Sequence, residues 1–190
     1  VNPAVKNAMN IITGPSNTVV GVDMSPAMVI ELLDLYGNRC TNDNATNISI
    51  SILNNPSNAT LYGMTPVAVV SGVSTFSGIY FDRYGLGYTL SVSSAGLTSI
   101  TSGSFNVESA HATRYWVGPL DGNWELDSNW ANDAAGSDQT RCFWPGYGDT
   151  AVFTSNFVTD ADMNADLNIA AINMQTGYTG TVDANDNNVT

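Results

Sequence analysis

The sequence predicts an all-β chain made of two parts, and three observations lead to this prediction. Short apolar stretches alternate with polar residues, and turn residues separate them about every 8–12 residues. No segment carries the apolar stripe that marks an amphipathic helix over a useful length. The charge also changes along the chain: residues 1–114 hold four basic and six acidic side chains, whereas residues 115–190 hold one basic and eleven acidic side chains.

The composition excludes two classes of protein. The 190 residues carry a formal net charge of −12, and only 12% of them are charged. Binding to phosphate backbones needs a cationic surface, so we expect no nucleic-acid partner. No apolar run approaches the roughly 18 residues of a transmembrane helix, so we expect no membrane span.

The residue types point outside the cell. The chain is rich in Asn, Ser, Thr and Gly, which favour turns and polar strand faces, and it has few Lys and Glu. It begins Val1-Asn2-Pro3, without a basic or apolar leader, so we expect that any signal peptide has been removed. These features predict a secreted or cell-surface protein.

The first part, residues 1–109, reads as a series of strands. In residues 46–53 every second residue is Ile, which gives one buried and one polar face. Ser71-Gly72 predicts a tight hairpin. Seven strands in about 100 residues predict an immunoglobulin-like β-sandwich. The expected strands cover residues 8–13, 27–34, 46–53, 60–70, 73–81, 88–94 and 100–107.

Three motifs in this part resemble a known family. Residues 29–39 (VIELLDLYGNR), the hairpin 69–76 (VVSGVSTF) and residues 85–90 (GLGYTL) are similar to segments of bacterial immunoglobulin-like repeats of the invasin and intimin type. The resemblance covers roughly residues 8–107. It implies a spacer or adhesive module, and it carries over no catalytic residue.

The second part, residues 115–190, follows an expected linker at 110–114 and holds all four Trp. Its residues 115–153 resemble the entry segment of β-solenoid regions in large bacterial surface proteins, with Gly122-Asn123-Trp124 and Gly148-Asp149-Thr150-Ala151-Val152-Phe153 among the matching motifs. Residues 167–174 and 177–183 then read as rungs. A rung alone cannot bury its apolar face, so we expect a small β-solenoid-like domain. The Trp residues either stack on sugars or form the core of this domain.

Four oxygen-bearing side chains recur at every second position: Asp160, Asp162, Asn164 and Asp166. On a strand they share one face, and Ca²⁺ takes carboxylate and amide oxygens, so these residues are candidate metal ligands. The opposite face carries Ala161, Met163, Ala165 and Leu167, so ordinary strand alternation explains the pattern equally well. No other cofactor is expected.

Cys40 and Cys142 allow one disulfide. Strand directions in the expected sandwich place Cys40 at the end where the chain enters, whereas the second part begins at the other end, about 25 Å away. A disulfide needs Cα atoms within about 7 Å. We therefore expect Cys142 to reach Cys40 of the next subunit in a head-to-tail homopolymer, unless both residues remain reduced thiols.

Asn44, Asn47 and Asn58 head Asn-x-Ser/Thr sequons, so they are candidate glycosylation sites in a glycosylating host. The sequence carries none of the usual hydrolase, metalloprotease or phosphate-binding motifs, and no catalytic residue is predicted. We expect a non-enzymatic extracellular structural protein, a subunit or segment of a surface layer, stalk or filament with a possible adhesive role. The alternative is a module that binds surface glycans or cleaves a polysaccharide.

Overall fold

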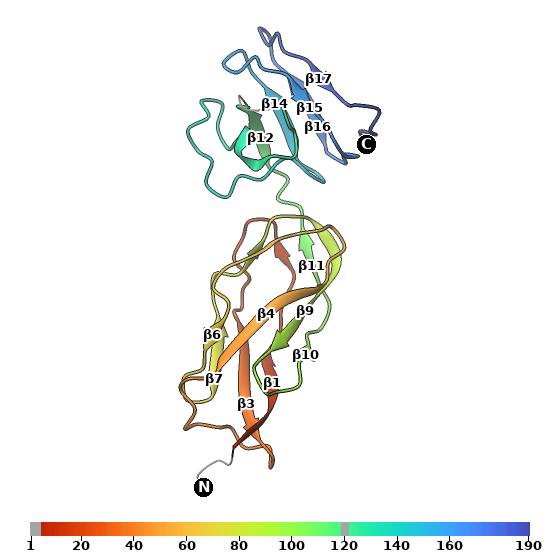
Figure 1. Cartoon of the computed structure of the whole chain (residues 1–190). Coiled ribbons are helices and arrows are strands. Elements are labelled where there is room, and N and C mark those ends of the chain that lie inside the picture. Colours follow the sequence, from red (N-terminus) through yellow and green to blue (C-terminus); the bar gives the residue numbers. More distant parts are fainter. Residues whose placement is uncertain (1–4, 119–121) are drawn as a thin grey trace. The chain divides into compact units, whose positions relative to one another are not determined.

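The computed structural model describes residues 5–118 and 122–190 of the chain. The chain divides into two compact units, Val1–Glu108 (unit 1) and Ser109–Thr190 (unit 2), which are treated separately below. Strands form both units, and a 3-10 turn at Asp127–Asn129 is the one helical element among the described residues. The all-β prediction is confirmed (Figure 1).

Unit 1 contains two principal sheets. One has the order β1-β3-β7, and the other has the order β2-β11-β9-β4-β6, with β10 also paired to β9; a separate ladder joins β5 and β8. The strands are β1 (Lys6–Thr13), β2 (Thr18–Val19), β3 (Met28–Asp34), β4 (Asn47–Asn54), β5 (Leu61–Tyr62), β6 (Val67–Ala68), β7 (Val73–Phe76), β8 (Tyr80–Phe81), β9 (Gly85–Ser93), β10 (Ile100–Thr101) and β11 (Phe105–Glu108).

Strand alternation builds the core of unit 1. On β3, every second residue is buried, from Met28 to Leu32. These side chains meet those of the second sheet, among them Ile48 on β4 and Leu90 on β9, in one apolar cluster. Residues spaced by two along a strand share one face, so the two sheets bury their apolar faces against each other.

The expected strands match unit 1 unevenly. The alternating segment 46–53 is β4, and Ser71-Gly72 makes the expected hairpin with φ angles of 50° and 75°. Two residues with positive φ give the turn whose twist suits antiparallel strands. The expected strand at 60–70 is instead divided into β5 and β6, because Pro66 offers no N–H and Gly63 adopts φ +116°. The seven-strand immunoglobulin-like topology stays a prediction.

Unit 2 has a different pairing. Its strands are β12 (Thr113–Trp116), β13 (Trp130–Ala131), β14 (Thr150–Phe153), β15 (Ala161–Asp162), β16 (Ala171–Met174) and β17 (Val182–Asp183). One sheet has the order β13-β12-β14-β16, and a second joins β15 to β17. Strand β12 begins at Thr113, so the last two residues of the expected linker already pair with β14.

Successive rungs of unit 2 stack in parallel. Strand β14 pairs with β16 so that Thr150 faces Ala171, and β15 pairs with β17 so that Ala161 faces Val182. Both registers correspond to a shift of 21 residues, and Leu167 forms a parallel bridge to Val189. Residues 150–170, here called the middle rung, thus lie against residues 171–190, the outer rung.

Candidate functional site

The acidic side chains of unit 2 hold neighbouring rungs together. An Asp160 carboxylate oxygen accepts a hydrogen bond from the Thr181 backbone N–H at 2.7 Å. Asp166 accepts the Asn188 backbone N–H at 2.8 Å. The amide of Thr181 lowers the pKa of Asp160, because the hydrogen bond stabilises the ionised form. Both carboxylates belong to the middle rung, and both amides belong to the outer rung.

Glu125, which precedes the middle rung in the chain, accepts backbone N–H groups of that rung in the same way. Its Oε1 atom accepts the backbone N–H groups of Asn164 and Ala165 at 2.9 and 3.0 Å. Its Oε2 atom also receives the side-chain amide of Asn164 at 3.3 Å. Sequence reasoning missed Glu125, because it lies 39 residues from its partner and no local spacing marks it.

Three of the four residues predicted as Ca²⁺ ligands make hydrogen bonds within unit 2. Asp160 and Asp166 bind backbone amides, and Asn164 binds Glu125. Strand β15 ends at Asp162, and Ala165 is exposed at the following turn, so the expected four-residue alternation breaks there. Within residues 5–118 and 122–190, no group of three or more His, Cys, Asp or Glu converges in a way that would hold a metal ion.

Three of the four Trp residues form the core of unit 2. Trp116, Trp124 and Trp130 are completely buried around Phe153, with ring centroids 5.2 Å apart for Trp116 and Trp130. The indole N–H of Trp130 donates to the Trp124 carbonyl at 2.8 Å. Of the two readings of these residues, the structure supports a core role and leaves no face of these three rings for a sugar.

Both cysteines are buried thiols. Cys40 is 2% exposed and Cys142 is 5% exposed, and they are not bonded to each other. Burial raises the pKa of both thiols, which disfavours the reactive thiolate. An intersubunit bridge between them therefore requires local opening of both units, and it stays a prediction.

A buried cation lies beside Cys142. The Arg114 side chain points inward from β12 and is 7% exposed. One guanidinium nitrogen contacts the Cys142 sulfur at 3.8 Å and donates to the side-chain oxygen of Asn132, while Nε has no hydrogen-bond partner in the described part of the chain. This buried Arg was not predicted from the sequence, because charged side chains are rarely buried in a β core.

A shallow polar hollow opens where unit 1 begins. It has a volume of about 330 Å³ and includes Lys6, Cys40 and Asp43 in its lining. The Lys6 ammonium donates to the Thr46 hydroxyl at 2.5 Å, and that hydroxyl donates to Asp43 at 2.6 Å. The Thr46 hydroxyl lowers the pKa of Asp43. The contacts fix the loop between β3 and β4, which lies at the end of unit 1 where β1 starts (Figure 1).

The candidate glycosylation residues are on the surface of unit 1. Asn44, Asn47 and Asn58 are all exposed. The Asn44 side-chain oxygen accepts the Ser71 backbone N–H at 2.8 Å, so its amide helps to fix the Ser71-Gly72 turn. Asn58 lies in a loop with φ 52°. Exposure satisfies the steric requirement for a glycan, and modification of these residues stays a prediction.

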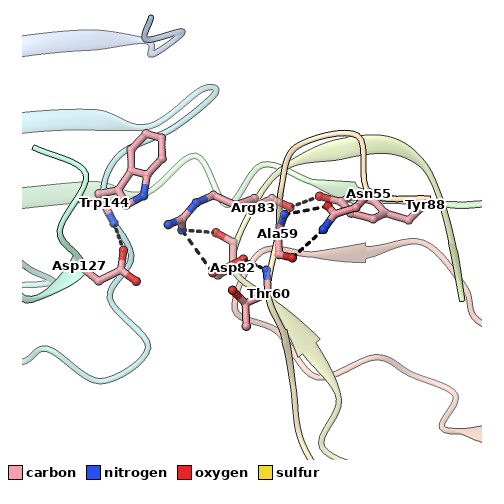
Figure 2. Close-up of polar contacts among 8 residues, drawn as sticks. All are labelled: Asn55, Ala59, Thr60, Asp82, Arg83, Tyr88, Asp127 and Trp144. Carbon is pink, nitrogen blue, oxygen red and sulfur yellow. Dashed lines mark hydrogen bonds and ion pairs between the residues drawn. The ribbon is translucent and has the colours of Figure 1, made fainter. Parts of the chain in front are cut away.

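A second polar network fixes loops of unit 1 (Figure 2). Buried Asp82 accepts the Thr60 backbone N–H at 2.7 Å, and Arg83 lies 3.7 Å from the same carboxylate. The Tyr88 hydroxyl donates to the Arg83 carbonyl at 3.1 Å, and burial raises the pKa of Tyr88. Such a bond from a tyrosine back to the preceding corner is typical of β-sandwiches.

Two further loops use side chains in the same way (Figure 2). In unit 1, the Asn55 amide both donates to and accepts from the Ala59 backbone at 2.8 Å. In unit 2, the Trp144 backbone N–H donates to Asp127 at 2.8 Å. Asn and Asp side chains in such turns replace backbone hydrogen bonds, which explains much of the unusual composition.

A second shallow hollow, of about 260 Å³, belongs to unit 2 and is lined in part by His111, Tyr147 and Asn168. Gly148 adopts φ +78°, and a Cβ atom there would lie 2.6 Å from His111 Nδ1. The hollow thus combines an exposed phenol ring, an imidazole and an amide, which are groups that can contact a sugar.

No family model matches the chain, and no curated protein matches it. Among solved structures, the chain is similar to a β-glycosidase from Bacteroides vulgatus, with 15% identity, a TM-score of 0.41 and coverage of 56% of this chain and 14% of that chain. Domains 4–9 of the surface layer protein SbsC match with 17% identity and a TM-score of 0.41, covering 65% and 17% of the two chains. A β-glucuronidase from Parabacteroides merdae matches with 15% identity and a TM-score of 0.38, covering 53% and 12%. The chain thus spans less than a fifth of the length of each of these proteins, and at these TM-scores the similarity carries no argument about function.

Proposed function

We propose that the chain is an extracellular structural protein, a subunit or segment of a cell-surface layer, stalk or filament that associates with identical copies and is not an enzyme. The observation that carries this proposal is the parallel stack of unit 2. Strands β13 and β16 are the two edges of its main sheet, and β12, β14 and β16 pair in parallel. A rung cannot bury its apolar face alone, so stacked rungs of this kind suit an extended structural module.

The use of polar side chains supports a structural role. Glu125, Asp160 and Asp166 bind backbone amides of the following rung, and Asp43 and Asp82 bind backbone amides of loops in unit 1. These bonds stabilise loops and rungs without large numbers of Lys or Arg. The composition that predicts a secreted protein thus corresponds to many hydrogen bonds between polar side chains and the backbone. None of the described residues belongs to a helix with the length and apolarity that crossing a bilayer requires.

A head-to-tail homopolymer linked by Cys40 and Cys142 is the finer form of this proposal. A non-reducing gel of the assembled protein tests it. A ladder that collapses on reduction, and that Cys40→Ser abolishes, supports the bridge. Monomer bands with and without reductant contradict it. Both thiols are buried in the folded chain, so the bridge requires local opening of each unit.

A second candidate function is binding of surface glycans, and the hollow that contains Tyr147 favours it. Tyr147 is exposed, in contrast to Trp116, Trp124 and Trp130. Binding to a glycan array that Tyr147→Ala abolishes and Tyr36→Ala preserves would support this candidate; Tyr36 is an exposed tyrosine of unit 1. Light scattering that rises with protein concentration and does not change with added sugars would instead support the structural proposal. A scattering intensity per molecule that is constant over the concentration series would contradict it.

A further inference from the structure

A buried cation in unit 2 lacks an anionic partner. Arg114 is 7% exposed, and no carboxylate of residues 5–118 or 122–190 lies within ion-pair distance of its guanidinium. Its Nε–H has no hydrogen-bond partner in these ranges. Its other contacts are with the side-chain oxygen of Asn132 and, at 3.8 Å, with the sulfur of Cys142. An unpaired buried charge and an unsatisfied buried donor both cost free energy, so this cluster favours an added anion.

Neighbouring groups hold the cluster in place. Arg114 lies on β12, between its partner strands β13 and β14. The Asn132 side-chain nitrogen donates to the Thr140 carbonyl at 3.0 Å, which turns the oxygen of this amide toward Arg114. The Cys142 backbone N–H donates to the Gln139 carbonyl at 3.2 Å. These bonds keep the guanidinium and the sulfur beside each other.

The charge beside Cys142 favours a negative group at the sulfur. Burial raises the pKa of this thiol, and Arg114 has the strongest effect in the opposite direction. Asp127 and Asp138 have smaller effects, which raise the pKa. A neutral thiol is only a weak acceptor, so it does not compensate the guanidinium. An anionic group on the sulfur would compensate it through a charge-assisted hydrogen bond.

Cys40 has the opposite surroundings. Burial raises the pKa of its thiol, and the carboxylates of Asp34 and Asp43 raise it further, ahead of the opposing effect of Lys6. Both cysteines are similarly buried, at 2% exposure for Cys40 and 5% for Cys142. The two thiols thus differ in the charges around them more than in access to solvent, and Cys40 serves as an internal control.

We propose that Cys142 is a site of oxidation by peroxide, and that its product, a sulfinate, is the anion that pairs with Arg114. A first peroxide transfers one oxygen atom to the sulfur, which converts the thiol to a sulfenic acid and releases water. Unit 2 has no second cysteine that could form a disulfide with this group. A second peroxide therefore adds another oxygen and again releases water, and the sulfinic acid loses its proton to become the sulfinate. Each step oxidises the sulfur by two electrons and reduces one peroxide.

The spacing accommodates the added oxygens. The 3.8 Å between the guanidinium nitrogen and the sulfur is about 1 Å longer than a charge-assisted N–H···O bond of about 2.8 Å. An oxygen bonded at an angle to the sulfur thus lies within hydrogen-bond distance of Arg114. The second oxygen adds an acceptor beside a guanidinium whose Nε–H has none among the described residues. Because Cys142 is buried and its pKa is raised, we expect the reaction to be slow and to proceed through local opening.

Peptide mass spectrometry of the intact folded chain after treatment with hydrogen peroxide tests the site. We expect Cys142 to gain two oxygen atoms while most of Cys40 remains a thiol. Arg114→Met should reduce this gain, because it removes the cation that favours the anionic sulfur, and Arg141→Met, at an exposed position, should not. Circular dichroism verifies that each variant is folded. A Cys142 that stays a thiol overturns the inference, as do equal oxidation of both cysteines and a gain that Arg114→Met leaves unchanged.

The stability of unit 2 provides a second measurement that does not depend on the reaction. Cys142→Asp places a carboxylate where the sulfinate would lie, and Cys142→Asn has the same shape without the charge. With Arg114 present, the Asp variant should have the higher urea midpoint. In the Arg114→Met background the order should reverse, because the carboxylate is then a buried charge without a partner. An order that is the same in both backgrounds overturns the pairing with Arg114.

The sulfinate is independent of the proposed disulfide and of the structural function. A sulfinate cannot form a disulfide, and the gel described above detects the disulfide whereas mass spectrometry detects the added oxygens. Cys40→Ser removes one partner of the disulfide and should leave the oxidation of Cys142 unchanged. Oxidation that Cys40→Ser abolishes would overturn the inference.

Discussion

The carboxylate of Asp160 binds the backbone N–H of Thr181, a residue that lies 21 positions later and one rung further along unit 2. The same 21-residue shift relates the paired strands β14 and β16. The side chain thus fixes the register that the backbone ladder repeats. The strong acidity of residues 115–190 has a structural explanation in contacts of this kind, at least for Glu125, Asp160 and Asp166.

Removing the Asp160 acceptor should destabilise unit 2. We expect Asp160→Ala to lower its urea midpoint and Asp160→Asn to lower it less, because Asn keeps an oxygen acceptor. Asp162→Ala is the control, since no hydrogen bond to the Asp162 carboxylate is seen among the described residues. Tryptophan fluorescence reports unit 2 alone, because all four Trp lie there. Equal midpoints for Asp160→Ala and Asp162→Ala would contradict the role of Asp160.

The same bond predicts an acid dependence. The pKa of Asp160 is lowered from 3.8 in the folded chain. Its contribution to stability is therefore present above about pH 3.8 and is lost as the pH falls through the lower folded value. The difference in midpoint between the wild type and Asp160→Ala should shrink as the pH is lowered through that range. A difference independent of pH would show that the ionised carboxylate is not responsible.

Phe153 should be the most sensitive position of the unit 2 core. It is completely buried and contacts three indole rings and Tyr178. We expect Phe153→Ala to reduce the free energy of unfolding of unit 2 by about 3–5 kcal/mol. Phe157→Ala, at a half-buried position, should have a smaller effect. Both values come from denaturant titrations followed by tryptophan fluorescence, and a larger loss for Phe157→Ala would refute this description of the core.

Tyr178 predicts an alkaline dependence. Burial, together with the nearby Asp160 charge, raises the pKa of Tyr178 from 10.0 to about 12, and its hydroxyl donates to the Thr159 carbonyl at 2.8 Å. Because the folded pKa is the higher one, this contribution is present below pH 10 and is lost as the pH rises toward 12. Tyr178→Phe should lower the urea midpoint at pH 8. Between pH 10 and 12, its midpoint should fall by less than the midpoint of the wild type. Identical pH profiles for the two proteins would rule this out.

Arg114 should be replaceable by an uncharged side chain of similar length. Its guanidinium is buried, and within the described residues no carboxylate lies within ion-pair distance of it. Burial of a charge without a close counter-ion costs free energy, so we expect Arg114→Met to leave unit 2 equally stable or up to about 2 kcal/mol more stable. Arg141→Met, which removes an exposed charge, is the control. A large loss of stability for Arg114→Met alone would show that the cation is needed.

The sequence predicted some elements because their signal is local. The Ile alternation before Asn54 and the Ser71-Gly72 turn depend on neighbouring residues, and both were located correctly. Strand β2 was missed because two residues carry no periodicity, and its parallel partner β11 lies about 90 positions later. The segment 171–174 was recognised as part of a rung, but its parallel pairing with residues 150–153 could be seen only in the structure.

The candidate sites were harder to predict for the same reason. The spacing of Asp160, Asp162, Asn164 and Asp166 is compatible with a metal site, a strand face or a set of amide acceptors, and only the position of the next rung distinguishes them. The burial of Cys40 and Cys142 likewise depends on residues distant in sequence. Side-chain chemistry can be read from a sequence, whereas the partner of each group is set by the tertiary fold.

Electron microscopy of the purified chain over a concentration series tests the central claim, association with identical copies in an extracellular structure, most directly. The account predicts ordered arrays or filaments that appear as the protein concentration rises and that are unchanged by added sugars. Isolated particles of monomer or dimer size at every concentration would contradict it.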